Sequence, residues 1–156
     1  MTKLNQIGFL LLAITLTFGS CSTKKKNPSW VINEVMVNNK TNMIDEFGQR
    51  NGWIEIYNNT AKTQDLGGMY LTTDKNNPKM YPIPLGDART RIKPYQQAIF
   101  WADAKPFHGN FHTNFELDST RENYIALYDV DGKTLIDEII VPKGIPADKT
   151  FGYPKD

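Results

Sequence analysis

The sequence has very little cysteine, histidine or serine for its 156 residues. Cys21 is the only cysteine, so no disulfide can form within the chain. Beyond the N-terminal region the only serines are Ser29 and Ser119, and neither lies in the Gly-x-Ser-x-Gly setting of many serine nucleophiles. There is also no glycine-rich phosphate-binding loop. The sequence therefore predicts no catalytic residue and no cofactor, and we expect a protein that is not an enzyme.

Neither sign of charge is in excess. The chain carries 18 lysine and arginine residues against 17 aspartate and glutamate residues. Residues 1–20 contain one charged residue, Lys3, so residues 21–156 have no net charge. When the consecutive lysines at 24–26 are set aside, 14 basic residues stand against 17 acidic ones. Such a body has no overall electrostatic attraction for nucleic acid, and we expect no nucleic-acid partner.

The N-terminal region has no hydrophobic run long enough to cross a membrane. Its apolar run, Ile7–Phe18, has about 12 residues, whereas a membrane-spanning helix needs roughly 20. This run follows Lys3 and leads into Phe18-Gly19-Ser20-Cys21. The arrangement resembles a bacterial lipoprotein signal, which is cut before the cysteine so that the thiol can be lipidated. The alternative is an ordinary secretory signal followed by a coincidental free cysteine.

We therefore predict three regions. Residues 1–20 are expected to be a lipoprotein signal peptide, residues 21–29 a flexible tether with lipid (palmitate) on Cys21, and residues 30–156 a folded domain. Two or more acyl chains hold a protein firmly on a bilayer, since each buried methylene contributes about 0.8 kcal/mol.

Residues 30–156 lack the three-to-four-residue apolar period of an amphipathic helix. They contain short segments rich in β-branched and aromatic residues, separated by Gly, Asn, Asp and Pro. Strands are predicted at residues 30–37, 53–58, 66–74, 79–83, 97–102, 113–117, 124–128 and 134–141. Many short strands with regular turns indicate an all-β sandwich or barrel. The expected core residues are Ile54, Ile56, Leu71, Ile99, Trp101, Phe115, Ile125, Leu127, Leu135 and Ile139.

Alternation in the first predicted strand assigns its side chains to two faces. It places Trp30 and Ile32 on one face, and Val35 and Val37 on the other.

A series of short motifs follows the same order as in a known family. They are Ile32-Asn33-Glu34, the segment 52–58 that ends in Asn58, Leu66-Gly67-Gly68, Ile92-Lys93-Pro94 before Ile99-Phe100-Trp101-Ala102, His112-Thr113-Asn114-Phe115-Glu116-Leu117, and a hairpin over 125–136. Together they resemble the lamin-tail domain, over about residues 30–153. The resemblance implies an immunoglobulin-like β-sandwich that serves as a non-catalytic interaction module.

Three arrangements of polar residues could bind a metal ion, and none is predicted to do so. His108 and His112 are four residues apart, but Gly109 and Asn110 between them indicate an irregular loop on which that spacing brings nothing together. The segment 129–132 looks like the start of a calcium loop, but an EF-hand would need Glu where Ile140 stands. Its Asp-Gly pair is better explained by a hairpin turn. Asp45, Glu46 and Glu55 could also gather oxygen ligands for calcium near the first long loop, whereas solvated loop carboxylates are the default interpretation.

Aromatic residues are more numerous than one sandwich core needs. An exposed row could stack on sugars or grip a peptide, whereas the plainer interpretation is packing in the core and at its edges. The surface-binding candidates are Trp53, Phe107, His108, Phe111 and His112. Asp118-Ser119-Thr120 resembles a bacterial O-glycosylation acceptor, and an Asx-type turn is the alternative.

These observations favour a non-catalytic, membrane-anchored interaction module of the bacterial cell envelope. The expected partners are the membrane, through the N-terminal lipid, and a protein, a glycan or another envelope component. Ser22 rather than Asp follows Cys21, and no acidic cluster comes after it, which favours the periplasmic face of an outer membrane. The alternatives are an outward-facing carbohydrate-binding or calcium-dependent adhesin and, with less support, a hydrolase with an unrecognised site.

Overall fold

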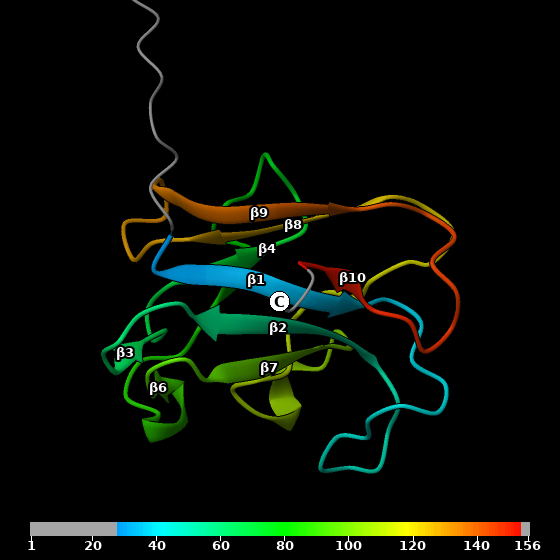
Figure 1. Ribbon diagram of the computed structural model, residues 1–156, viewed down its shortest axis with the longest axis horizontal. Coiled ribbons are helices and arrows are strands. Elements are labelled where there is room, and N and C mark those ends of the chain that lie inside the picture. The colour runs from blue at the N-terminus through cyan, green and yellow to red at the C-terminus, as the bar shows by residue number, and fades with distance from the viewer. Residues whose placement is uncertain (1–27, 154–156) are drawn as a thin grey trace, which may run out of the picture.

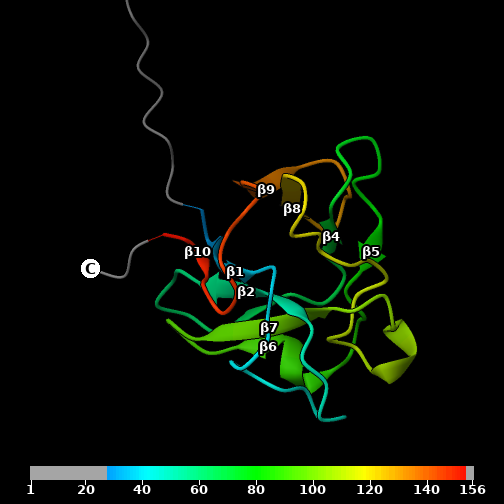
Figure 2. The ribbon, with the colours of Figure 1, turned by 90° about the vertical axis from the view of Figure 1, so that its right-hand side faces the viewer.

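Two antiparallel sheets pack face to face in the computed structural model, which describes residues 28–153 (Figure 1). Figure 2, turned by 90°, shows the two sheets as separate layers. The predicted signal peptide and Cys21 lie outside the described residues. Within residues 28–153, no helix combines the length and hydrophobicity needed to span a bilayer.

Each main sheet has four strands. The first has the order β10-β1-β2-β7, and the second has the order β5-β4-β8-β9. The strands of the first sheet are β1 (Trp30–Met36), β2 (Gly52–Asn58), β7 (Gln97–Ala102) and β10 (Phe151–Gly152). Those of the second are β4 (Tyr70–Thr72), β5 (Tyr81–Pro82), β8 (Asn123–Tyr128) and β9 (Leu135–Val141). A small ladder joins β3 (Gln64–Asp65) to β6 (Arg91–Ile92), and two 3₁₀ turns, η1 (Ala88–Thr90) and η2 (Pro106–His108), complete the fold. The predicted all-β sandwich is confirmed.

The predicted strands differ from the observed ones where turns and short ladders intervene. Residues 113–117 form no strand, and this region makes isolated bridges, His112 with Trp101 of β7 and Glu116 with Asp103 just after β7. The strand predicted at 66–74 is limited to β4, because Gly68 has a φ of 85° and belongs to a turn. The strands β3, β6 and β10 have two residues each, too few to show alternation in a sequence.

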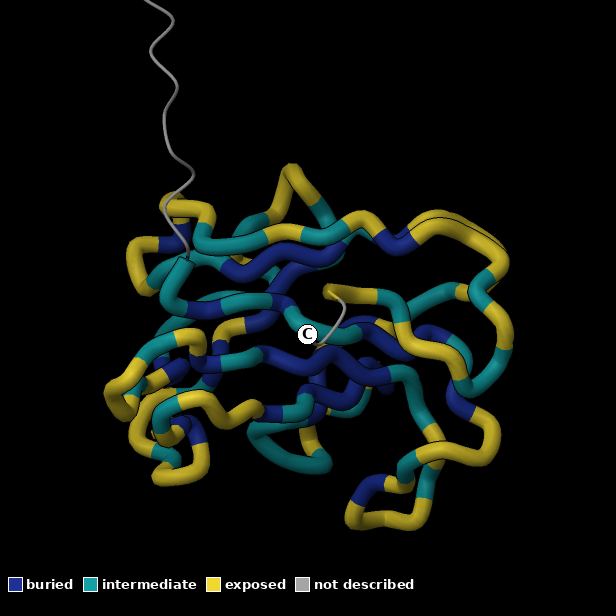
Figure 3. Tube along the Cα trace, in the orientation of Figure 1, coloured by how far each residue is buried: buried dark blue, intermediate teal, exposed yellow. Residues whose placement is uncertain are grey.

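The main core fills the space between the two sheets, and buried residues follow the middle of the strands in Figure 3. Fully buried side chains come from both sheets: Trp30, Ile32, Ile54, Ile56 and Phe100 from the first, and Leu71, Ile125, Leu127 and Val141 from the second. Burying each large apolar side chain contributes about 1.5–3 kcal/mol. Most of the predicted core is confirmed, and Ile99 and Ile139 are partly buried. Leu135 is wrongly predicted: it is 42% exposed, beside the hairpin turn, after the β8–β9 register shifts between Leu127 and Tyr128.

A β-bulge in β1 changes which side chains meet the core. The pairing of β1 with β2 shifts between Ile32 and Glu34, which leaves Asn33 as the extra residue. Trp30 and Ile32 before the shift, and Val35 after it, therefore belong to the same main core. The prediction that they lie on opposite faces is wrong, because simple alternation cannot detect one inserted residue.

Asn58, at the end of β2, is a buried polar residue that holds the neighbouring loops. It is 0% exposed, and its side-chain amide donates to the carbonyl oxygens of Lys62 (2.8 Å), Ile92 (3.0 Å) and Lys93 (3.0 Å). Its Oδ1 accepts from the backbone N–H and the hydroxyl of Thr60. One side chain thus satisfies groups from two segments that are distant in sequence.

We expect Asn58→Asp to lower the free energy of unfolding by about 2 kcal/mol or more, because a carboxylate cannot donate to the three carbonyl groups. Urea denaturation measures the change. Asn59→Asp is the matched control: Asn59 is exposed, and its substitution should cost less than about 0.5 kcal/mol. Equal losses at the two positions would contradict the role assigned to Asn58.

Candidate functional site

The outer face of the first sheet carries a second apolar cluster. Met36, Trp53 and Trp101 are buried there, and Met43 and Ile99 pack against them. Met43 belongs to the loop of residues 38–51, which folds over this face. Trp53 is consequently only 3% exposed, so the prediction of an exposed aromatic at this position is wrong.

The loop of residues 38–51 is held partly by its own side chains. Asp45 Oδ1 accepts from the backbone N–H groups of Phe47 (2.9 Å) and Gln49 (2.7 Å), and its Oδ2 accepts from the Asn51 amide. Asn39 donates to the carbonyl oxygens of Met43 and Asn51.

Three carboxylates considered for calcium take separate partners. Asp45 binds its own loop, Glu46 lies 3.3 Å from His112 Nε2, and Glu55 Oε1 accepts from the Asn33 amide at 2.6 Å. The structure therefore does not bring them into one group of ligands.

Asp148 fastens the same loop to the connection between β9 and β10. Its Oδ1 accepts from the backbone N–H groups of Lys40 (2.7 Å) and Thr41 (2.8 Å), and its Oδ2 accepts from the Thr41 hydroxyl (2.8 Å). These bonds favour the charged carboxylate and lower the pKa of Asp148 to about 2. Its own backbone N–H donates to the Asn38 carbonyl oxygen. One side chain thus joins segments more than 100 residues apart in sequence.

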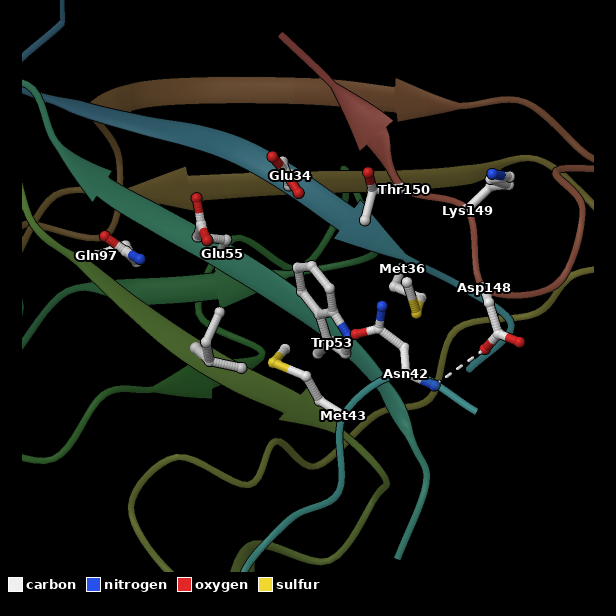
Figure 4. A pocket seen from close by; sticks show the side chains of 11 residues that line it. Glu34, Met36, Asn42, Met43, Trp53, Glu55, Gln97, Asp148, Lys149 and Thr150 are labelled. Carbon is white, nitrogen blue, oxygen red and sulfur yellow. Dashed lines mark hydrogen bonds between the residues drawn. The ribbon is translucent and has the colours of Figure 1, made fainter. Parts of the chain in front are cut away.

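A groove of about 510 Å³ lies between the outer face of the first sheet and these two segments (Figure 4). Strands β1, β2 and β7 and the loops at 42–43 and 148–150 line it: Glu34, Met36, Asn42, Met43, Trp53, Glu55, Gln97, Ile99, Asp148, Lys149 and Thr150. Apolar side chains from the second cluster are thus flanked by acidic, basic and amide groups. The groove therefore offers another molecule both apolar and polar contacts.

A second group of functional side chains gathers beyond the end of β7. Asp103, His108 and His112 each offer a potential ligand atom, and these atoms lie within 4.8 Å of one another. The prediction that the two histidines are not brought together is wrong, because the loop 104–112 curls back against β7. The backbone N–H of Trp101 donates to the Phe111 carbonyl oxygen, and the Trp101 carbonyl oxygen accepts from the Thr113 N–H. These bonds hold the end of the loop against the sheet.

The Asp103 carboxylate is the centre of this group. It is buried, and its Oδ2 lies 2.9 Å from His112 Nδ1 and 3.7 Å from His108 Nδ1. Its Oδ1 accepts from the Lys105 N–H at 3.1 Å. Sequence reasoning missed Asp103, although its position directly after an apolar strand was a usable signal.

The aromatic residues around this group have different degrees of exposure. Phe47 contacts both imidazoles, with ring centroids 4.1 Å from His108 and 5.7 Å from His112. Phe107 is 80% exposed, as expected of a surface candidate, whereas Phe111 is partly buried against Phe100 of the core. His112 is 0% exposed and is not itself a surface residue.

The outer face of the second sheet is rich in tyrosine, with Tyr70 from β4 and Tyr124 and Tyr128 from β8. Burial, followed by hydrogen bonding to Tyr128 and Glu138, raises the pKa of Tyr124. Lys75 Nζ lies 4.7 Å from the centre of the Tyr124 ring, and Lys79 Nζ lies 5.6 Å from that of Tyr70. Cations therefore already cover one side of two rings, which leaves less open aromatic surface for a sugar.

Two sequence motifs form turns. Asp131 Oδ1 accepts from the N–H groups of Lys133 and Thr134, and Gly132 has a φ of 63°, as the predicted hairpin requires. The Asp118 carboxylate accepts from the N–H and the hydroxyl of Thr120, which is the Asx-type turn.

A family model for the lamin tail domain matches residues 23–142. The chain therefore belongs to the lamin tail domain family, a family of non-enzymatic, immunoglobulin-like domains that often serve as interaction modules. No curated protein and no solved structure matches the chain.

Acid should weaken the attachment of the 38–51 loop through Asp148. Its pKa is lower in the folded state than its ordinary value near 4, so its contribution to stability is complete above about pH 4 and is lost as the pH falls towards 2. We expect Asp148→Asn to be less stable than the wild type at pH 7, and the difference to shrink towards zero near pH 2. Asparagine tolerates the φ of 60° at this position, so the backbone should be retained.

Urea denaturation of both proteins between pH 7 and pH 2 measures this difference. Asp87 and Asp131 also have lowered pKa values, but they are present in both proteins and cancel in the comparison. A stability difference that does not change with pH would contradict the assignment to Asp148.

Proposed function

We propose that the chain is a lipid-anchored, non-catalytic interaction module of the bacterial cell envelope. In this proposal Cys21 carries the lipid, residues 21–29 act as a tether, and the domain faces the periplasm from the outer membrane. Its groove binds a partner protein. The observation that carries the proposal is the position of the groove relative to the start of the domain.

The groove lies mainly towards the end of the sandwich at which β1 finishes. The tether would join the domain at Pro28, next to Trp30 at the start of β1. Met36, at the other end of β1, pairs with Trp53 and lines the groove. Six residues of strand separate Trp30 from Met36 by about 20 Å. The loop of residues 38–51 and the β9–β10 connection lie on this far side in Figure 1. A domain anchored at one end would thus present its groove away from the bilayer.

A protein fits the groove better than a glycan fits the tyrosine face. The groove combines the partly exposed apolar side chains of Met43 and Ile99 with carboxylates from β1 and β2, and methionine adapts well to varied apolar partners. On the opposite sheet, by contrast, Lys75 and Lys79 cover tyrosine rings that a sugar would need. These contacts favour a protein partner.

The anchor is tested by changing its attachment site. We expect wild-type chains to fractionate with membranes and their mature N-terminal peptide to begin at an acylated Cys21 in mass spectra. Cys21→Ala should leave an uncut or soluble product, because no thiol remains for the lipid. Unchanged membrane fractionation of this variant would rule out the proposed anchor.

The groove is tested by site-specific photo-crosslinking in native membranes. A photo-reactive residue in place of Lys149, which is exposed and lines the groove, should give a defined protein adduct. The same residue in place of Lys62, also exposed but near the other end of β2, should not. Adding Gln97→Trp, which fills the groove from β7, should abolish the adduct. Adducts of equal strength at both lysine positions, or an adduct insensitive to Gln97→Trp, would speak against a partner in the groove.

A further inference from the structure

We propose that Asp103, His108 and His112 form a metal site that binds one divalent transition-metal ion, with Zn²⁺ as the best match. This inference goes beyond the proposed interaction function and does not depend on it. It starts from the convergence of two imidazole nitrogens on one carboxylate oxygen. Asp103 Oδ2 lies 2.9 Å from His112 Nδ1 and 3.7 Å from His108 Nδ1.

These two separations are close to those expected of ligands around one ion, and all three potential ligand atoms lie within 4.8 Å of one another. Two ligand atoms bound tetrahedrally to Zn²⁺, each at 2.0–2.1 Å, lie about 3.3 Å apart. The two observed separations fall on either side of this value, so small movements of the side chains would complete the site. Two histidines and one carboxylate form a common ligand set for zinc and related transition metals.

Hydrogen bonding within the protein does not account for all the ring nitrogens. His112 Nδ1 has the Asp103 carboxylate as its partner, but His108 Nδ1 is buried without a hydrogen-bond partner. His112 Nε2 is also buried, but it faces Glu46 and not Asp103, so His108 Nδ1 is the unpartnered nitrogen beside the proposed ion. Buried polar atoms in native proteins usually have a partner, and an unpartnered imidazole nitrogen beside a carboxylate is what a metal would satisfy. A simple Asp103–His112 pair would leave His108 unexplained.

The surroundings have the features of an outer shell that orients metal ligands. In many metal sites the second nitrogen of a coordinating histidine faces a carboxylate. Glu46 Oε2 occupies this position, 3.3 Å from His112 Nε2, and a small rotation would make it a hydrogen-bond acceptor. Lys105 donates its backbone N–H to Asp103 Oδ1, which leaves Oδ2 for the ion. Phe47 stacks on the His108 ring and limits its rotation.

The segment after β7 supplies all three proposed ligands, and the ion would fix the orientation of both imidazoles. Glu46 and Phe47, from the loop of residues 38–51, lie against these imidazoles without being ligands themselves. Calcium is a poor match for the site, since it prefers six to eight oxygen ligands and imidazole is not among them.

Isothermal titration of the untagged purified chain, after treatment with a chelator, tests the proposal. We expect one Zn²⁺ per chain, a higher melting temperature with Zn²⁺, and no response to Ca²⁺. His108→Phe keeps an aromatic ring against Phe47 but removes both nitrogens, and it should weaken Zn²⁺ binding by about 100-fold or more. Glu46→Gln should weaken it by about 10-fold, as expected of an outer-shell residue. Glu122→Gln, an exposed carboxylate outside the group, is the control and should bind like the wild type.

His108→Phe also separates metal binding from folding, because a folded variant with an unaltered circular dichroism spectrum should still lose the thermal response to Zn²⁺. If Zn²⁺ produces neither heat nor a thermal shift in the wild type, or if His108→Phe binds it equally well, the proposal is overturned. Either result leaves the anchor and the groove standing, since their tests involve Cys21, Lys149 and Gln97.

Discussion

The first sheet buries apolar side chains on both of its faces, and the rest of the structure depends on this double burial. Its inner face packs on the second sheet through Ile54, Ile56 and Phe100, whereas its outer face carries Met36, Trp53 and Trp101. A sandwich normally leaves one face of each sheet to the solvent. Here the outer face needs a cover, and the loop of residues 38–51 provides it. The groove exists because that cover is incomplete.

The same requirement explains several local features that would otherwise be unrelated. The bulge at Asn33 brings Val35 into the main core and places Met36 in the outer cluster. Because a loop cannot cover an apolar face without anchors of its own, Asp45 ties it internally and Asp148 ties it to the β9–β10 connection. Both anchors are carboxylates that accept from backbone N–H groups of the loop.

The fold was largely predictable from the sequence, because its long strands carry clear patterns of their own. Residues 97–102 form the strand that their apolar run predicts, and Asn58 ends the strand whose motif suggested it. The exceptions have physical causes. The bulge at Asn33 inserts one residue that alternation cannot detect. The apolar character of Trp53 does not show whether a loop covers its side chain. The groove was not predictable, because it depends on a contact between residues 40–42 and 148 across the whole chain.

The histidine group is a second example of proximity that the sequence alone does not predict. A spacing of four residues means proximity on a helix, whereas on an irregular loop only the path of the backbone decides it. The end of the loop after β7 forms backbone hydrogen bonds with Trp101, and these bonds place His112 against the buried Asp103. Asn42 and Met43 of the covering loop line the groove, whereas Glu46 and Phe47 of the same loop meet the histidines. The two sites therefore share one loop, and an interaction that fixes this loop at the histidines also fixes one wall of the groove.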